Sequence, residues 1–149
     1  MDYVIELSRI NTKEALSIIT HLKNIYFDCG NVSDFWNETE IKNWLSDESD
    51  YCIGAYYNNE IIGFCLTHYH AQVNKVHLEN IFVVENYRRK GIAKKMLKEV
   101  FGFYNKLGKR IRYIGLVNTN NDNAVCMLKN MDFIIGEKMF WVQKNPKGI

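Results

Sequence analysis

The chain has 149 residues, 47% of them hydrophobic, and a formal net charge of +2 at neutral pH. This length predicts one domain, residues 1–149, with an ordinary hydrophobic core. No apolar run approaches the length of about 18 residues that a membrane-spanning helix requires, and the first residues lack the basic and long apolar stretches of a secretory signal. We therefore expect a soluble, cytoplasmic protein that does not act at a membrane.

Residues 3–7 alternate in polarity, which predicts a first strand. Asn11 or Thr12 is then a suitable N-cap for a helix that Gly30 would end. The apolar residues of this helix are expected on one face: Ala15, Leu16, Ile19, Leu22 and Ile25.

A second, shorter helix is expected to begin near Ser33 or Asn37 and to end near residue 45. It lies in an acidic segment, residues 28–50, that holds seven acidic residues and one basic residue, so the rest of the chain carries a net charge of +8. Such a segment predicts a cationic partner, or else is a solvated helix face. On the first interpretation five residues would bind the substrate: Asp28, Asp34, Trp36, Glu38 and Glu40.

Two further strands are predicted at residues 52–57 and 61–69. Asn58-Asn59 joins them, because asparagine tolerates the positive φ angles of a tight type I′ hairpin turn. The four cysteines show no Cys-x-x-Cys spacing and lie among apolar neighbours, so we expect buried free thiols and no metal site. They are Cys29, Cys52, Cys65 and Cys126.

The most informative stretch is the strand-to-helix junction at residues 88–93. Residues 78–84 before it form an apolar, β-branched run with one acid, which is typical of a buried strand. After it, apolar residues recur every three or four positions as far as Leu107, which predicts an amphipathic helix ended by Gly108. A junction of this kind presents free backbone N–H groups and the positive end of the helix dipole.

Basic residues strengthen the positive potential of this junction: Arg88, Arg89, Lys90, Lys94 and Lys95. Gly91 and Ala93 are small enough for a ligand to lie against the backbone. The expected ligand is a phosphate or pyrophosphate, and the alternative is a solvated helix start that binds nothing. Nucleic acid is not expected, because basic and aromatic residues are not spread along one face.

Three more elements complete the chain. Residues 112–117 predict another apolar strand, so that strand, helix and strand form a right-handed parallel crossover. Residues 121–131 predict a short helix, and residues 133–143 predict two final strands broken near Gly136. The elements together predict an α/β (α+β) fold with about four helices and a mixed, mostly antiparallel sheet of seven strands.

Residues 78–93 resemble motif A of the Gcn5-related N-acetyltransferases, the GNAT superfamily, whose pyrophosphate loop reads Gln/Arg-x-x-Gly-x-Gly/Ala. The Asn-rich turn at residues 118–123 and the dipeptide Asp132-Phe133 resemble the family's next motif, so the resemblance extends over about residues 51–143. Leu78-Glu79, nine residues before the loop arginine, is most similar to the spermidine/spermine (diamine) acetyltransferases. The resemblance implies the GNAT fold, which has the sheet and the crossover expected above.

The resemblance also implies acetyl-CoA as the cosubstrate, bound by the motif A strand, the basic junction and the Asn-rich motif. The residues implied in that binding are Ile81, Phe82, Val83, Arg88, Arg89, Lys90, Gly91, Ile92, Ala93, Lys94, Asn118, Asn121, Asn123 and Lys129. A backbone N–H near Phe82 or Val83 would polarise the acetyl carbonyl.

Glu79 is the candidate general base. A carboxylate inside an apolar strand must have a partner or a purpose, and the resemblance places Glu79 at the catalytic glutamate position of the diamine acetyltransferases. The alternative is a structural acid. His77 lies on the same face of the strand and is a candidate second catalytic residue in a proton relay, or else a solvated side chain.

Two positions depart from the family pattern. Many relatives carry a tyrosine that protonates the leaving sulfur, whereas this chain has Leu128 there, and Asp132 replaces the usual glycine. A thiol with a pKa near about 8.5 leaves tolerably as its anion, so the change need not abolish activity. Tyr113 or Tyr87 could substitute, although both are better explained as packing residues.

These observations predict an acetyl-CoA-dependent N-acetyltransferase that acts on a small cationic amine by direct attack in a ternary complex. The expected amine is a polyamine, with an aminoglycoside-like or amino-acid-like amine as near alternatives. Two alternatives stay open: an enzyme that acetylates a protein N-terminus or lysine, and a non-catalytic acyl-CoA-binding module. A homodimer is an expected assembly.

Overall fold

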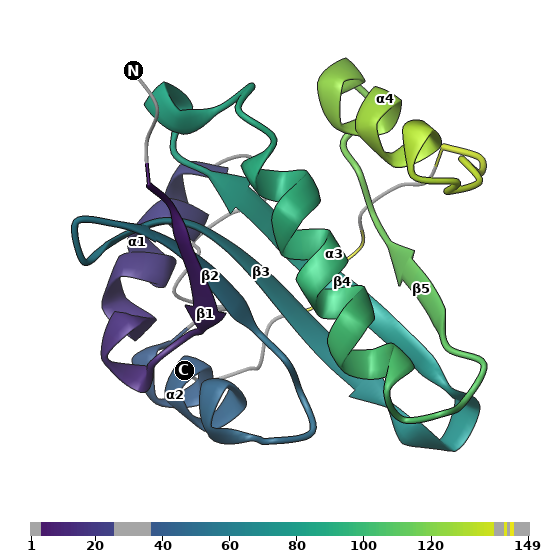
Figure 1. Ribbon diagram of the computed structural model, residues 1–149, viewed down its shortest axis with the longest axis horizontal. Coiled ribbons are helices and arrows are strands. Elements are labelled where there is room, and N and C mark those ends of the chain that lie inside the picture. The colour runs from purple at the N-terminus through teal and green to yellow at the C-terminus, as the bar shows by residue number, and fades with distance from the viewer. Residues whose placement is uncertain (1–3, 26–36, 139–141, 143, 145–149) are drawn as a thin grey trace. The chain divides into compact units, whose positions relative to one another are not determined.

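A five-stranded sheet is the frame of the protein in a computed structural model, which describes residues 4–25, 37–138, 142 and 144 (Figure 1). The strands lie in chain order across the sheet: β1 (Glu6–Arg9), β2 (Ile53–Tyr57), β3 (Glu60–His70), β4 (Lys75–Val83) and β5 (Arg112–Gly115). The first four pair antiparallel, and β4 pairs with β5 in parallel. The prediction of a mixed, mostly antiparallel sheet with one parallel pair is therefore confirmed.

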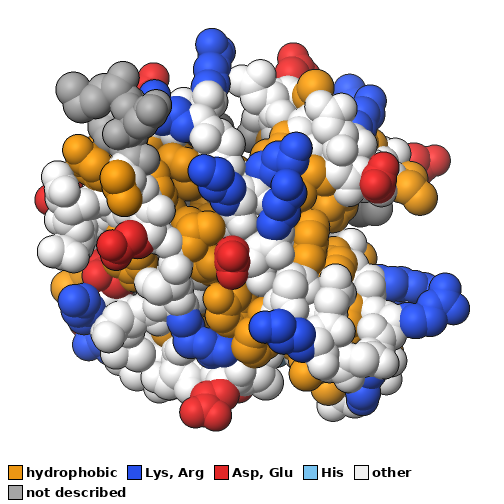
Figure 2. All heavy atoms as spheres, in the orientation of Figure 1, with side chains coloured by type: hydrophobic (Ala, Val, Ile, Leu, Met, Phe, Trp, Pro, Cys, Tyr) orange, Lys and Arg blue, Asp and Glu red, His pale blue; other side chains and the backbone are white. Residues whose placement is uncertain are grey.

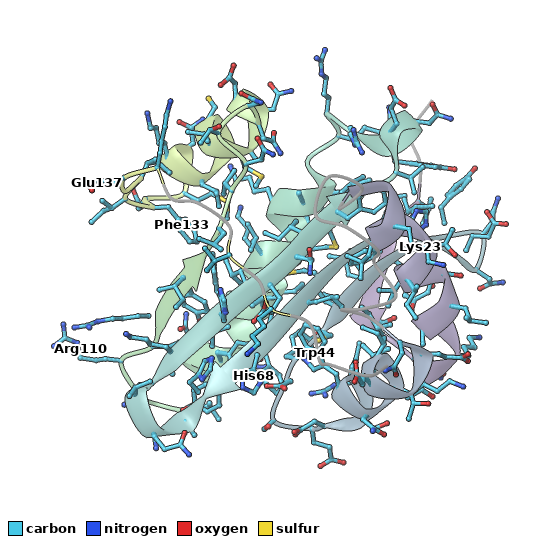
Figure 3. The ribbon with its side chains drawn as sticks, turned by 180° about the vertical axis from the view of Figure 1, so that it is seen from behind. Lys23, Trp44, His68, Arg110, Phe133 and Glu137 are labelled. Carbon is cyan, nitrogen blue, oxygen red and sulfur yellow. The ribbon has the colours of Figure 1, made fainter. Side chains whose placement is uncertain are left out.

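The chain divides into two units, Met1–Gly115 and Leu116–Ile149. The first unit holds the sheet and three α-helices, α1 (Ala15–Ile25), α2 (Glu38–Ser46) and α3 (Ile92–Asn105). Figure 1 shows α3 across one face of the sheet, and Figure 3, drawn from behind, shows α1 and α2 on the opposite face. The second unit contains α4 (Asp122–Asn130).

Local sequence signals account for several element boundaries. The Asn11 side chain accepts a hydrogen bond from the Lys13 N–H at 2.9 Å, at the start of the 3-10 turn η1 (Thr12–Glu14) that leads into α1. The Asn37 side chain accepts from the Glu40 N–H at 2.8 Å and caps α2. Asn58 and Asn59 have φ angles of 49° and 65°, so both occupy the left-handed region as the hairpin turn between β2 and β3 requires.

One hydrophobic core lies between the sheet and the helices α1 and α2. Its members are Ile10, Ala15, Ile18, Ile19, Leu22, Ile41, Leu45, Cys52, Ile61, Phe64 and Leu66. The assignment of Leu16 to the buried face of α1 was wrong, because its side chain is 59% exposed while Ile18 is fully buried. Ala15, Ile19 and Leu22 are buried as expected, so the buried face of the helix extends toward Ile18 and leaves Leu16 outside.

The other face of the sheet packs against α3 through a buried polar contact. The Tyr104 side chain is fully buried, and its hydroxyl lies 2.6 Å from the Thr67 hydroxyl and accepts from the Tyr51 N–H at 2.7 Å. Thr67 in turn donates to the Tyr51 carbonyl at 2.8 Å. These bonds tie α3 to the central strand β3 and to the start of β2.

We expect Tyr104→Phe to lower the free energy of unfolding by about 1–3 kcal/mol, because the Tyr51 N–H loses its acceptor in a buried place. Tyr113→Phe is the matched control. Its hydroxyl bonds to Asn105 at an exposed position, so its loss is expected to cost about 1 kcal/mol or less. Urea unfolding followed by circular dichroism measures both, and equal losses would contradict the structural role of Tyr104.

The end of the chain differs from the expectation. The described residues contain five strands instead of seven, and residues 133–138 form no strand. A strand is stable only when a neighbouring strand takes its backbone hydrogen bonds, and the second unit offers none among its described residues. The rest of the predicted pair, from residue 139, lies almost wholly outside the described residues.

The cysteine prediction holds for two residues. Cys52 and Cys65 are buried free thiols, and burial raises the pKa of Cys52 to about 12 and the pKa of Cys65 further. Cys126 is exposed, which corrects the expectation, because it lies two residues from Leu128 and so on the opposite side of α4. Cys29 lies outside the described residues.

No helix in residues 4–25 and 37–138 combines the length and the apolar character that crossing a bilayer requires. The same residues contain no group of three or more histidine, cysteine or acidic side chains that could hold a metal ion.

Candidate active site

Strand β4 changes its pairing at Glu79. Leu78 lies opposite Thr67 of β3 and Asn80 lies opposite Leu66, so Glu79 is an extra residue in a β-bulge. The parallel pairing with β5 ends at the same place, with Leu78 opposite Gly115. The strand therefore separates from β5 just where its one carboxylate stands.

Glu79 and His77 contact each other on one face of β4. The distance between Glu79 Oε1 and His77 Nδ1 is 2.8 Å, and the two side chains are 30% and 29% exposed. The contact holds the carboxylate in place, and its partial exposure leaves it open to a ligand. Their catalytic role remains a prediction.

Beyond the bulge, β4 presents backbone groups at the edge that β5 has left. The Val84 N–H donates to the Ile62 carbonyl of β3 at 2.8 Å, so Val83, the preceding residue, directs its backbone groups to the other side. Its carbonyl accepts from Arg88 Nε at 2.7 Å, in agreement with that direction. The Val83 N–H is thus a donor that points to the edge of β4 away from β3, beyond the last residue that pairs with β5.

The basic junction leads into the N-terminus of α3. Gly91 is the N-cap residue, with φ of 76°, and no side chain caps the helix there. A Cβ atom built on Gly91 would have no atom within 4 Å, so the space over this turn is open. Arg89 also has a positive φ, 62°, which bends the chain back before the helix. The first N–H groups of α3 and the positive end of its dipole therefore face open space.

Positive charge surrounds this turn. The residues Arg88, Arg89, Lys90 and Lys94 are exposed, and Figure 2 shows Lys and Arg side chains standing out on the face that carries α3. The remaining predicted contacts of the first unit are less exposed: Ile81, Phe82, Val83, Ile92 and Ala93. Four basic side chains and a helix N-terminus form an arrangement that suits a pyrophosphate.

The Asn-rich motif belongs to the second unit. Asn121 caps α4 by accepting from the Ala124 N–H at 3.1 Å, and Asn118 accepts from the Asn120 N–H at 2.9 Å. Asn123 and Lys129 are exposed on α4. These contacts explain the conformation of the turn. That these residues bind the cofactor stays a prediction.

The proposed substrate residues are only partly described. Asp28, Asp34 and Trp36 lie outside the described residues. Glu38 stands in the first turn of α2 and pairs with Lys42 at 2.8 Å, and Glu40 is exposed. Their place beside a substrate therefore stays a prediction.

A hollow of about 230 Å³ lies between α1 and the hairpin of β2 and β3. Its lining includes His21, Glu14 and Glu60. The His21 ring lies 4.8 Å from the ring of Phe82 on β4, and burial lowers the pKa of His21. The predicted site residues do not line this hollow, although Phe82 borders His21.

Two side chains that the sequence did not single out lie close to the bulge. Asp50 is 3% exposed, and its Oδ2 atom lies 2.9 Å from His68 Nδ1. His68 is the direct cross-strand neighbour of His77. Asp50 was counted among the acidic residues of segment 28–50, and no sequence signal linked it to a histidine 18 positions away.

The tyrosines considered as substitutes for the missing acid are packing residues in this structure. The Tyr113 hydroxyl donates to Asn105 at 3.0 Å and its ring lies against Phe101, and burial raises its pKa to about 12. Tyr87 packs against Tyr57, with ring centroids 5.8 Å apart.

Comparison with known proteins places the chain in a family. The family model described as "Acetyltransferase (GNAT) family" matches residues 16–133. None of the curated proteins compared with the chain matches it in sequence.

Three similar solved structures show the same fold. The PaiA N-acetyltransferase from Thermoplasma acidophilum, in complex with coenzyme A, is 18% identical with a TM-score of 0.77, over 91% of this chain and 93% of that one. The aminoglycoside N-acetyltransferase AAC(6')-Iy, in complex with CoA, is 16% identical with a TM-score of 0.73, over 97% of both chains. An aminoglycoside acetyltransferase from an uncultured soil metagenomic sample, in complex with sisomicin, is 17% identical with a TM-score of 0.70, over 96% of this chain and 97% of that one.

The coenzyme A in two of these structures fits acetyl-CoA as the cosubstrate of this chain, whose basic junction has the open space and the donors that a pyrophosphate requires. The family model covers most of the chain, and the chain therefore belongs to the acetyltransferase (GNAT) family as an acetyl-CoA-dependent N-acetyltransferase.

Proposed function

We propose that the enzyme transfers the acetyl group of acetyl-CoA to a primary amine of a small cationic molecule, such as a polyamine, by direct attack in a ternary complex. The observation that carries this proposal is the position of Glu79. Its carboxylate stands at a bulge, supported by His77, at the point where β4 separates from β5.

The acceptor requires a base. An alkylamine has a reference pKa near about 10.4, so only about one molecule in a thousand is unprotonated and nucleophilic at neutral pH. Glu79 would take the proton from the ammonium group, either directly or through one water. His77 would hold the carboxylate in the orientation that the contact of 2.8 Å defines.

The backbone of β4 would stabilise the acetyl oxygen, and the start of α3 would bind the pyrophosphate of the cosubstrate. The Val83 N–H faces the open edge and would donate to the acetyl oxygen as negative charge develops on it. The N–H groups after Gly91, together with the exposed basic side chains, would hold the pyrophosphate of the cosubstrate. A thiolate leaves near the positive end of this helix without a tyrosine to protonate it.

The substrate class rests on charge and on the position of Glu79 in motif A. Segment 28–50 holds seven acidic residues and one basic residue. Aminoglycosides and polyamines are both polycationic amines, and two of the similar structures are aminoglycoside acetyltransferases. This likeness supports a polycationic acceptor. A polyamine is favoured because Glu79 lies nine residues before Arg88, the spacing that resembles the spermidine/spermine acetyltransferases.

We expect kcat/KM for spermidine or spermine to exceed that for a monoamine of similar length, and the ratio to fall as salt is added. Each exposed carboxylate contributes only about 0.2–1 kcal/mol, so several must act together and salt must screen them. Steady-state kinetics of CoA release at low and high ionic strength measures the ratio.

Reversal of Glu38 and Glu40 to lysine should raise KM for the polyamine and leave KM for acetyl-CoA unchanged. Glu6→Lys, an exposed reversal on β1, is the matched control and should change neither value. A preference for neutral or acidic amines, or a preference that ignores both salt and the reversals, would show that segment 28–50 is only a solvated face.

A further inference from the structure

A second pair of carboxylate and imidazole lies beside the Glu79–His77 pair. Asp50 is nearly fully buried in the loop between α2 and β2, and its two carboxylate oxygens are both used. Oδ2 lies 2.9 Å from His68 Nδ1, and Oδ1 accepts the Tyr69 N–H at 2.7 Å. Asp50 is therefore rigidly held and fixes the ring of His68.

The register of the sheet brings the two pairs together. His68 of β3 and His77 of β4 are direct partners in the antiparallel ladder, so their side chains leave the same face with Cβ atoms about 4.5–5.5 Å apart. The His68 side chain is 46% exposed, whereas Glu79 and His77 are less exposed. His68 is therefore the most exposed of the three side chains and the best placed to exchange a proton with solvent.

Besides Asp50 and His77, few titratable or polar side chains lie near His68 among the described residues. His70 on the same strand has its ring 4.4 Å from that of His68. From the loop after α2, Asp47 is close enough to interact with His68 electrostatically, and its carboxylate bonds to Ser49. From α2, Trp44 donates to the Thr67 carbonyl next to His68, and Figure 3 shows both labelled side chains near the centre of this face.

The reaction proposed above produces one proton for each amine acetylated. Glu79 can act again only after this proton has left the carboxyl group. The carboxylate is 30% exposed, and an acceptor bound over it would restrict its access to water. A path through the neighbouring imidazole of His68 would release the proton away from the acceptor.

We propose that His68, oriented by Asp50, is a positioning residue that receives the proton from the Glu79–His77 pair and releases it to solvent. This inference rests on the proposed function. The N–H bond of the ammonium group breaks and an O–H bond forms on Glu79. Glu79 then passes this proton through one water to His68 Nε2, while His77 keeps its Nδ1–H hydrogen bond to the carboxyl group.

His68 then releases this proton from Nε2 to bulk water, which restores its starting tautomer with Nδ1–H donating to Asp50. One proton enters from the amine and one leaves to solvent, so the step balances without any other reactant. Asp50 stabilises the transient imidazolium of His68 and keeps Nε2 directed away from the carboxylate.

The test first compares two histidine variants with wild type in the CoA-release assay, with the best amine substrate. We expect His68→Gln to lower kcat by about 3- to 30-fold near pH 7, less than loss of the base itself, because the base still works but recovers slowly after each turnover. The deficit should shrink as the pH rises toward the pKa of the amine, since fewer protons then need to be removed. His70→Gln, a histidine of the same strand without a carboxylate contact among the described residues, should stay within about twofold of wild type.

Chemical rescue separates a proton-transfer role from a structural one. Added imidazole should restore much of the lost rate of His68→Ala and should leave wild type and Glu79→Gln unchanged. Thermal unfolding of each variant checks that the fold is kept.

Three outcomes would overturn the relay: His68 variants with the activity of wild type, a deficit that is independent of pH, or no rescue by imidazole. A wild-type protein that releases no CoA with any amine would refute the proposed function, and the relay with it. Normal wild-type turnover with unaffected His68 variants would refute the relay alone.

Discussion

Glu79→Gln is expected to keep the fold and the affinity for acetyl-CoA while lowering kcat by about 10²- to 10⁴-fold near neutral pH. Glutamine has the shape of glutamate and can still contact His77, but it cannot accept a proton from the substrate. The loss should be largest where the amine is almost wholly protonated. It should shrink as the pH approaches the pKa of the amine, near about 10.4, because free amine then enters directly.

Steady-state kinetics from neutral to alkaline pH measures this loss. Glu60→Gln is the control, since Glu60 is an exposed carboxylate at the start of β3. A Glu79→Gln enzyme as fast as wild type at neutral pH would remove Glu79 from the mechanism. Direct loss of the proton to water, or to His77, would then be the better explanation.

Gly91→Val is expected to weaken the binding of CoA by about 10²- to 10⁴-fold. The valine side chain would enter the open space over the turn, where a pyrophosphate would otherwise meet the first N–H groups of α3. Loss of two hydrogen bonds to a charged group, each contributing about 1.5–3 kcal/mol, gives a change of this size. Isothermal titration calorimetry with CoA measures it.

Gly108→Val is the matched control for this substitution. Gly108 has φ of 70°, close to the 76° of Gly91, and the space around its Cβ position is also open. Both valines suffer the same backbone strain, about 1–2 kcal/mol, but Gly108 lies beyond the C-terminal end of α3. Equal CoA affinity in the two variants would show that the junction at Gly91 does not bind the pyrophosphate.

Features that depend on neighbouring residues were predictable from the sequence. Asn37 caps α2 and Asn58-Asn59 forms the hairpin turn, because each of these signals acts within four residues. The strand-turn-helix at residues 88–93 has the same local character, and its glycine takes the left-handed conformation that the motif requires.

Features that depend on long-range packing were not predictable. Leu16 is exposed because of the way α1 packs on the sheet. An apolar residue at the border of the helix's apolar stripe can be either buried or exposed, and the sequence does not decide which. The bulge at Glu79 arises from the register between β3 and β4, and a single sequence does not specify register across a sheet. The pairing of Asp50 with His68 is hidden for the same reason, because the two residues meet only when the loop after α2 reaches β3.

The central claim is that this member of the family acetylates small cationic amines. The measurement that tests it most directly is the release of CoA from acetyl-CoA by the wild-type protein, with a panel of polyamines, aminoglycosides, monoamines, amino acids and a lysine-containing peptide. We predict turnover that is highest with the polyamines and absent without an amine. No release with any acceptor, while CoA still binds, would indicate a non-catalytic acyl-CoA-binding module, and turnover with the peptide alone would indicate a protein acetyltransferase, so either result would contradict the claim.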